Sequence, residues 1–465
     1  MFENSAKYLP NNRRLAFKFF LVFVFMLFAF PRARLIPSLP FYVIDAFILG
    51  SYLYVTTQKG FTIKTAGLLF LLLVSASLSE LQGLFVYGYP LESIYMLVRF
   101  VAGITIAFSI SKLLIDHRLL VIIIKVATLG ALISAITIVL ASLPFTRSIV
   151  NGIIFSNPFL APPDDTLEGL EGAVRGRSLI GTSNLTAAFI NTILPYAFFA
   201  RVYAKRIIKG SVRVFNMFLI VGPLGVFLGY SRGGLLGLLL VLMGFLFLGS
   251  AKIRKTLIPL IILLSVFLAY AWGNQEYFMF DRIERRTAAV FQEGELAKSE
   301  KERLQSFTEP FVFMLNRPTF IILGEGNAAF RLKRRGTGIQ RIYDEREAAT
   351  HSAFAKGFYT YGISYSIVIF VLVFGLIIRN LGMAKKERNP MAKAALSASV
   401  VSLLALLPWM LTTHGMVTNP RGFYLYIFIY GLAYIVGFTP FLLKRYSYIQ
   451  FKYHQFLKKR SALQQ

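Results

Sequence analysis

An arginine set between small residues is the first candidate for chemistry in the chain. Arg232 stands in the segment Tyr230-Ser231-Arg232-Gly233-Gly234, a short polar turn between two apolar runs. Glycines let a ligand approach the backbone closely, and the first amides of a following helix are free to bind an anion. A guanidinium is always charged and binds two phosphate oxygens at once. The turn therefore predicts a phosphate site made by Arg232, with Ser231 and Gly233 as secondary members. The plainer alternative is an arginine that extends along a membrane surface.

Three further arginines are candidates for the same anion. Arg175 and Arg177 directly precede another apolar run. Arg303 lies in the longest polar segment of the chain. For each of them alone, a solvated charge is the ordinary interpretation.

A histidine at the edge of an apolar run is the candidate base. His351 opens such a run directly after the long polar segment. Imidazole titrates near neutral pH, so it can take a proton from a hydroxyl group while the arginines hold a phosphorylated partner beside it. His414 is the second choice, whereas His117 and His454 fall on the other side of the predicted membrane. A lone histidine at a membrane boundary is more often only an interfacial polar group.

The composition offers little for metal or thiol chemistry. The chain has no Cys and four His, with no HExxH motif. Disulfides, iron–sulfur clusters and thiol catalysis are therefore excluded, and no zinc site is predicted. No group of carboxylates outside the predicted membrane has the spacing of metal ligands. We expect neither a metal nor another cofactor.

The elements that must position these residues are membrane helices. Hydrophobic residues make up 56% of the chain and charged residues 15%, whereas soluble domains have about 45–50% and about 25%. This balance excludes a soluble enzyme, a disordered protein and a collagen. Apolar runs long enough to cross a bilayer recur throughout. We expect an all-α polytopic membrane protein of about twelve transmembrane helices, at residues 15–30, 36–56, 63–80, 92–111, 119–143, 178–200, 214–230, 233–250, 256–272, 351–378, 394–412 and 421–443.

Lys and Arg fix the expected orientation, because cytoplasmic loops carry an excess of them. With both termini in the cytoplasm, alternate loops and the tail at 444–465 collect most of the basic residues. The formal net charge of +28 is then mainly a sign of membrane topology. We therefore predict no nucleic acid partner, although the basic tail should contact anionic lipid.

The alternation leaves two long loops on the outer side, at 144–177 and 273–350. The second holds 12 acidic and 13 basic residues, more than half of all acids, so it is expected to be a polar module. Helical apolar spacing at 280–291 and 296–315 predicts surface helices there. The chain is thus divided into nine spans with the first loop (1–272), a helical loop (273–350), three spans (351–443) and the tail.

Two ionisable residues fall deep in predicted spans. Asp45 lies in the second span and Arg99 in the fourth. An unpaired charge at that depth is costly. We expect the two to be partners, most simply a structural pair.

Four elements together resemble the superfamily of O-antigen ligases and O-antigen polymerases, over residues 175–375. They are Arg177-x3-Gly181-x2-Asn184, the turn Ser231-Arg232-Gly233, Arg303 followed by Arg317-Pro318 and Gly324-x-Gly326, and His351-Ser352 followed by Gly362. The last is similar to the ligase motif His-[Asn/Ser/Gln]-x9-Gly-x-x-Gly. Tyr365 stands where that motif has its second Gly.

The resemblance implies a membrane glycosyltransferase related to the GT-C type, in the inner membrane of a Gram-negative bacterium and with a periplasmic active site. Such an enzyme takes a finished glycan from undecaprenyl diphosphate without a metal. In lipopolysaccharide biosynthesis a ligase passes the glycan to a sugar of lipid A-core, whereas a polymerase passes it to another lipid-linked repeat. Arg232, Arg303, Arg177 and Arg175 would bind the diphosphate, and His351 would act as the general base of an inverting transfer.

The ligase is the predicted function, and the alternatives stay open. The polymerase belongs to the same superfamily. A transporter or flippase of lipid-linked sugars, or a structural membrane scaffold, would be a different class of protein. A cavity at mid-membrane would favour transport, whereas a cavity near the arginines and His351 that opens toward the outer leaflet would favour transfer.

Overall fold

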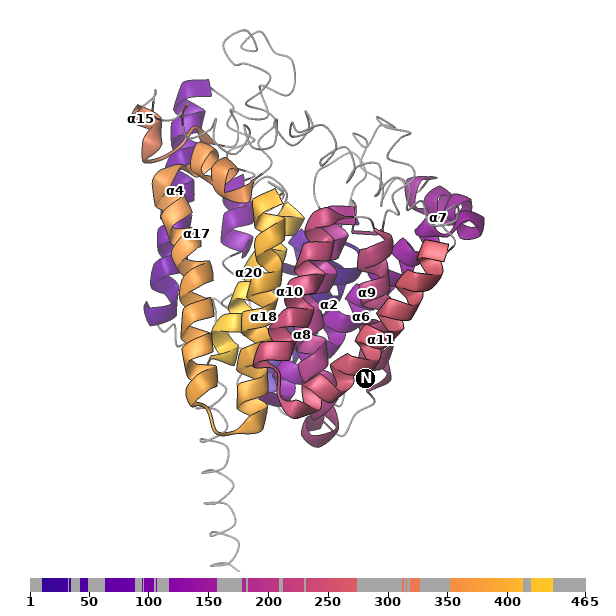
Figure 1. Cartoon of the computed structure of the whole chain (residues 1–465). Coiled ribbons are helices and arrows are strands. Elements are labelled where there is room, and N and C mark those ends of the chain that lie inside the picture. Colours follow the sequence, from indigo (N-terminus) through magenta and orange to yellow (C-terminus); the bar gives the residue numbers. More distant parts are fainter. Residues whose placement is uncertain are drawn as a thin grey trace, which may run out of the picture.

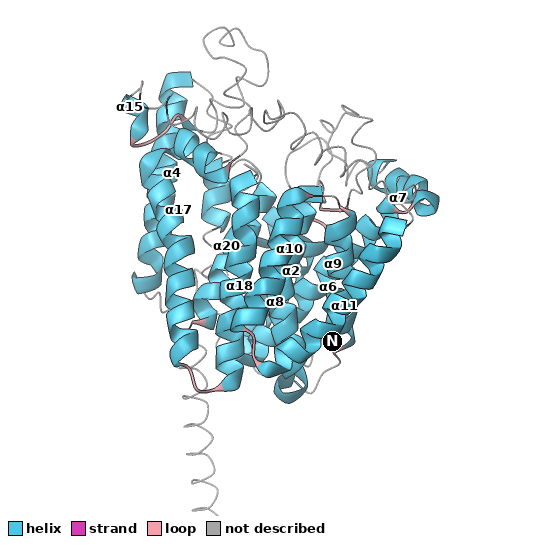
Figure 2. Cartoon of the chain, viewed as in Figure 1, coloured by secondary structure: helices cyan, strands magenta, loops and turns pink. Residues whose placement is uncertain are grey.

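The structure is a computed structural model whose described part is nearly all helical (Figure 1 and Figure 2). Within that part there is no β-strand, only an isolated bridge between Arg34 and Tyr42. An all-α fold is confirmed there. The structure describes residues 11–31, 33–34, 42–48, 63–87, 96–103, 117–156, 178–180, 183–208, 212–229, 231–273, 318–326, 352–412 and 420–437, with the single residues 94, 106, 312 and 315.

The helices follow the order of the predicted apolar segments. They are α2 (Asn11–Ala29), α4 (Ile63–Tyr87), α6 (His117–Ser142), α7 (Pro144–Ser156), α8 (Ser183–Ile208), α9 (Arg213–Leu228), α10 (Arg232–Leu248), α11 (Ala251–Gly273), α15 (Pro318–Ile321), α17 (Ala353–Lys386), α18 (Pro390–Thr412) and α20 (Pro420–Val436). Helical stretches at 43–48 and 96–103 are the described parts of the second and fourth predicted spans.

Four of these helices are long and apolar enough to cross a membrane, by length and composition: Leu119–Ser142, Ser183–Tyr203, Ala353–Lys386 and Pro390–Leu411. Shorter apolar helices accompany them at Phe17–Ala29, Arg213–Leu228, Gly233–Leu248 and Gly422–Val436. A membrane protein is therefore supported. The number of twelve spans stays a prediction, because the second and fourth are only partly described.

Helix α8 lies at the centre of the bundle and packs against α6, α9, α10 and α18. Small residues let the helices approach closely, since a Cβ placed on Gly234 of α10 would lie 2.5 Å from the Cβ of Ala187 on α8. Ser402 of α18 donates a hydrogen bond to the carbonyl of Thr192 on α8 at 2.6 Å. Close backbone contact and polar bonds of this kind hold helices together in lipid, where apolar burial gives no preference.

The outer helices expose large apolar side chains. Leu239 of α10, Ile262 of α11 and Ile378 of α17 are 52%, 58% and 69% exposed. A continuous apolar exterior of this kind suits a hydrocarbon surrounding rather than water. The exposed apolar surface therefore agrees with helices that face lipid.

The bundle has two distinct ends. In Figure 1 its upper end is where α8, α10 and α17 begin and where α6 and α18 finish. The lower end carries basic residues, among them Lys252 in the first turn of α11 and Lys385 and Lys386 in the last turn of α17. Which end of the bundle faces the cytoplasm stays a prediction.

Helix α7 follows α6 at the upper end and carries an apolar stripe. Phe145, Ile149 and Ile153, one on every fourth position, are 74%, 61% and 62% exposed. Arg147 donates hydrogen bonds to the carbonyls of Ala141 and Ser142, the last residues of α6. An exposed apolar stripe on a short helix is typical of a helix that lies in the membrane surface.

The predicted pair in spans two and four is confirmed. Asp45 and Arg99 are 5% and 3% exposed, and the charge of Arg99 acts on the Asp45 carboxylate. That carboxylate also accepts hydrogen bonds from the Tyr42 amide at 3.0 Å and from the Tyr424 hydroxyl at 2.8 Å. Because Tyr424 belongs to α20, the pair joins three segments that are distant in the sequence.

Helix α17 bends sharply at Gly362. This residue has φ 75° and ψ −176°, so α17 consists of two helices that meet at an elbow. The first half lies across the upper end of the bundle and the second half runs down its side (Figure 1). A Cβ at Gly362 would lie 2.1 Å from the carbonyl oxygen of Ile322. The sequence predicted one continuous span here and gave no sign of the elbow.

Replacing Gly362 by alanine is expected to destabilise the protein by about 1–3 kcal/mol from backbone strain alone, and by more from the clash with Ile322. The measurement is thermal unfolding of the purified protein in detergent. Gly375→Ala is the matched control, because it lies in the second half of the same helix and its Cβ would meet nothing within 4 Å. Equal melting temperatures for the two variants would show that the elbow is not a fixed part of the fold.

Candidate functional site

The turn between α9 and α10 is closed by Ser231, the N-cap of α10. Its Oγ accepts a hydrogen bond from the Gly234 amide at 3.0 Å and donates one to Oδ1 of Asn184 at 2.6 Å. Arg232 is the first residue of α10, and its side chain lies outside the described part of the structure. The bond from Ser231 to Asn184 brings two of the sequence motifs into direct contact.

A narrow pocket, too tight in this structure for a water molecule, lies at this turn. Asn191 also lines this pocket, two helical turns after Asn184. Its Nδ2 donates a hydrogen bond to the Gly234 carbonyl at 2.7 Å. Its Oδ1 has no hydrogen-bond partner among the described residues, although the side chain is 1% exposed. The start of α10 suits an anion, whereas the Oδ1 of Asn191 can accept a hydrogen bond from a donor such as a hydroxyl group. The lining residues are Asn184, Ala188, Asn191, Ser231, Gly233, Gly234, Ala405 and Trp409.

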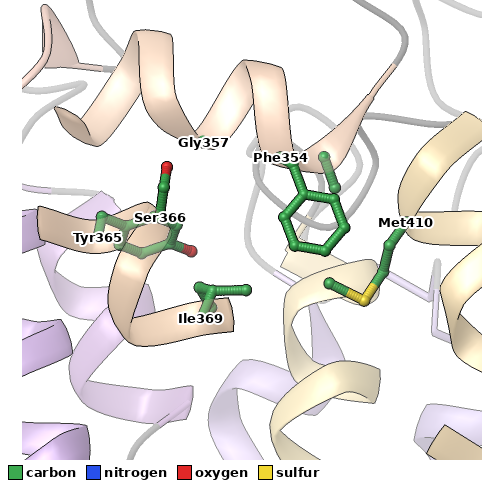
Figure 3. A pocket seen from close by; sticks show the side chains of 7 residues that line it. Phe354, Gly357, Tyr365, Ser366, Ile369 and Met410 are labelled. Carbon is green, nitrogen blue, oxygen red and sulfur yellow. The ribbon is translucent and has the colours of Figure 1, made fainter. Parts of the chain in front are cut away.

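A second narrow pocket lies inside the elbow of α17 (Figure 3). Phe354 from the first half of the helix and Met410 from α18 project into it, above Ile369 of the second half (Figure 3). Tyr365 and Ser366 add two hydroxyl groups. The pocket is thus mainly apolar, and Ala353 and Gly357 complete its lining.

The two pockets are lined by consecutive residues near the end of α18. Trp409 lines the pocket at the Ser231 turn, and the next residue, Met410, lines the pocket in the elbow. Helix α18 packs against α10 and against α17. The start of α10 and the start of α17 therefore lie on either side of one helix end, although they are far apart in the sequence.

The predicted base falls beside the second pocket by sequence. His351 directly precedes Ser352, which is 2% exposed and caps α17 by accepting a hydrogen bond from the Ala355 amide at 3.5 Å. His351 itself lies outside the described residues. So do His414, which follows the last residue of α18 by two positions, and Arg175, Arg177 and Arg303. The structure thus places Ser231 and Gly233, and the backbone of Arg232, but not the other predicted site residues.

Within the residues that the structure describes, no three His, Asp or Glu side chains gather as a metal site. The loop at 273–350, which holds most acids of the chain, is described only at a few positions. The absence of a cofactor stays a prediction.

Sequence reasoning missed several buried polar residues at the upper end. Glu80, Glu325 and Lys356 have no exposed surface. Lys356 carried a usable signal, because an ionisable residue inside an apolar run is a functional candidate. Asn191 carried another, because it lies seven residues after Asn184 and so on the same face of a helix.

A comparison with known families covers this region. A family model described as O-antigen ligase matches residues 215–369. The match begins in α9, includes Arg232, Arg303 and His351, and ends in α17 beyond the elbow. Arg175, Arg177 and His414 lie outside it. None of the curated proteins matches the chain.

Proposed function

We propose that this protein is a ligase-type glycosyltransferase, because residues 215–369 match a family model described as O-antigen ligase. It moves a glycan from undecaprenyl diphosphate to a sugar hydroxyl of lipid A-core at the periplasmic face of the inner membrane. The family match supports the broader statement directly: a membrane enzyme of the O-antigen ligase or polymerase type, with a lipid-linked glycan and an acceptor as its partners.

The proposed chemistry is a single displacement. The acceptor oxygen forms a bond to C1 of the donor sugar while the bond from C1 to the diphosphate oxygen breaks, which inverts the anomeric centre. His351 takes the proton of the acceptor hydroxyl. Negative charge grows on the leaving diphosphate, and Arg232 and Arg303 stabilise it, with Arg177 and Arg175 nearby. Fixed cations are effective in such a place because little water competes for the charge.

The observation that supports this proposal most is that Trp409 and Met410, consecutive residues of α18, each line one of the two pockets. One pocket adjoins the backbone of Arg232 and offers polar groups. The other is lined by Ala353, two residues after His351, and offers an apolar wall. A donor with a charged diphosphate and a lipid tail needs both kinds of surface next to each other.

The position of the pockets bears on the transport alternative. Both are lined by residues at the beginning of α10 or α17 and near the end of α18, so they lie toward the upper end of the bundle. A transporter site is expected near the middle of the membrane. This favours transfer over transport.

The polymerase is the second candidate. Tyr365, which replaces the second Gly of the ligase motif, is 2% exposed and forms a wall of the elbow pocket. A glycine there would leave more room in the elbow pocket. The shape of this pocket therefore differs from that implied by the ligase motif.

A transfer assay with the purified protein in lipid vesicles tests the proposal. The vesicles receive an undecaprenyl-diphosphate glycan with or without lipid A-core, and the products are separated on a gel. Product that depends on lipid A-core supports a ligase. A ladder formed from the lipid-linked repeat alone would assign a polymerase, and movement of the lipid across the vesicle without any product would replace transfer by transport.

A further inference from the structure

A buried acid links the loop that follows Arg303 to helix α17. Glu325 lies between Gly324 and Gly326, whose φ angles are 73° and 77°, and it has no exposed surface. Its amide donates to the Tyr359 carbonyl at 3.1 Å. Its Oε2 accepts a hydrogen bond from the Tyr359 hydroxyl at 2.6 Å. The turn is therefore bound to a single residue of α17 through both backbone and side chain.

The fit around this turn leaves no room for a side chain at either glycine. A Cβ on Gly324 would lie 2.5 Å from the Thr360 carbonyl oxygen on α17, and a Cβ on Gly326 would lie 2.8 Å from the Ser79 carbonyl oxygen on α4. The turn is thus held between two helices. Any shift of residues 318–326 would be passed on to the first half of α17.

A buried cation contacts the same tyrosine. Lys356 has no exposed surface, and its Nζ lies 4.9 Å from the centre of the Tyr359 ring. Tyr359 therefore interacts with a cation through its ring and with a carboxylate through its hydroxyl. Lys356 is one turn into α17, whose N-cap Ser352 directly follows His351.

The first half of α17 depends on these contacts for its orientation. It is separated from the second half by the elbow at Gly362. Phe358 and Tyr359 form a small apolar cluster with Phe320 of α15, apart from the main core. Ala353 and Tyr361 belong to the main core, so this segment is held both by the bundle and by the loop segment.

Stability alone does not account for these charges. Buried ionised groups cost much to dehydrate, and apolar residues of similar size usually hold a protein together at least as well. What a charged contact supplies is a defined geometry, because a hydrogen bond tolerates little displacement. We propose that Tyr359 is a positioning residue of the transfer reaction. Its contacts with Glu325 and Lys356 hold the start of α17 against the loop segment that follows Arg303. They thereby position His351. This inference rests on the proposed function.

Tyr359→Phe is the sharpest test, because it removes only the hydroxyl and keeps the ring beside Lys356. In the vesicle assay we expect kcat to fall about tenfold, with KM for the lipid-linked donor changed by less than about twofold. Glu325→Ala should have a similar effect, and Glu325→Gln, which can still accept the bond, should retain more activity. The double variant Tyr359→Phe/Glu325→Ala should be no slower than the slower single variant, since both remove one contact.

Tyr203→Phe is the matched control, because its hydroxyl donates to the Pro390 carbonyl at 3.1 Å at the lower end of the bundle. Its kcat should equal that of the wild type. Rates are divided by the amount of folded protein. A variant that only has a lower melting temperature therefore does not support the inference. The inference is overturned if the wild type transfers glycan and Tyr359→Phe matches it in kcat, or if Glu325→Gln is no better than Glu325→Ala. If the wild type itself does not transfer glycan, the proposed function is contradicted instead.

Discussion

Replacement of His351 by alanine is expected to lower kcat for glycan transfer by about 10²–10⁴-fold, because a positioned base contributes that much to proton removal. Binding of the donor should change little, since the diphosphate is held by the arginines. The measurement is initial rate against donor concentration in vesicles, together with donor binding to the purified variant. His351→Gln should be equally slow, because an amide can donate a hydrogen bond but cannot take the proton.

His117→Ala serves as the control for this prediction. His117 is the first residue of α6, at the lower end of the bundle, and it has no part in the proposed reaction. Its rate should be that of the wild type. If His351→Ala kept more than a tenth of the wild-type kcat, the proton would have to be removed by another group, with His414 as the next residue to replace.

Replacement of Arg232 by lysine is expected to reduce kcat by about 10²–10³-fold, the usual cost of losing one donor that stabilises developing charge. Lysine keeps the charge, but it lacks the planar fork that binds two phosphate oxygens. The effect should therefore be mainly on kcat and not on KM, because charge on the bridging oxygen grows in the transition state. Rates with saturating donor measure it.

Arg213→Lys is the matched control, because Arg213 is the first residue of α9 and lies at the opposite end of the bundle. It should transfer glycan at the wild-type rate. If Arg232→Lys were as active as the control, Arg232 would be an interfacial charge and the diphosphate would be bound elsewhere.

Much of the helical layout could be predicted from the sequence, because apolar runs and charges mark where helices leave a bilayer. The predicted span 119–143 corresponds to α6 (His117–Ser142), and the span 233–250 to α10. The tenth span was predicted to end at 378, but α17 continues to Lys386. Long basic side chains such as Arg379 and Lys385 can continue a helix beyond the apolar region, so charge marks the membrane boundary and not the helix end.

The geometry of the site was harder to predict. Gly362 appeared as a motif residue, but nothing in the sequence distinguishes a glycine with positive φ from one that merely packs closely. The turn Gly324-Glu325-Gly326 was recognised as glycine-rich, while the buried contact of Glu325 with Tyr359 depends on a tertiary approach that local pattern does not encode. Trp409 and Met410 line pockets beside two motifs that are distant from them in the sequence. This arrangement depends on tertiary packing, which the local sequence does not show.

The central claim is that the start of α10 and the start of α17 share one site for a lipid-linked glycan at the upper end of α18. A photoreactive undecaprenyl-diphosphate analogue, with its reactive group next to the diphosphate, tests this claim directly. After irradiation in vesicles and digestion, we predict labelled peptides from residues 231–237, 352–357 and 409–410, with labelling abolished by excess undecaprenyl diphosphate. Competed labelling confined to the lower end or the middle of the bundle would contradict the claim.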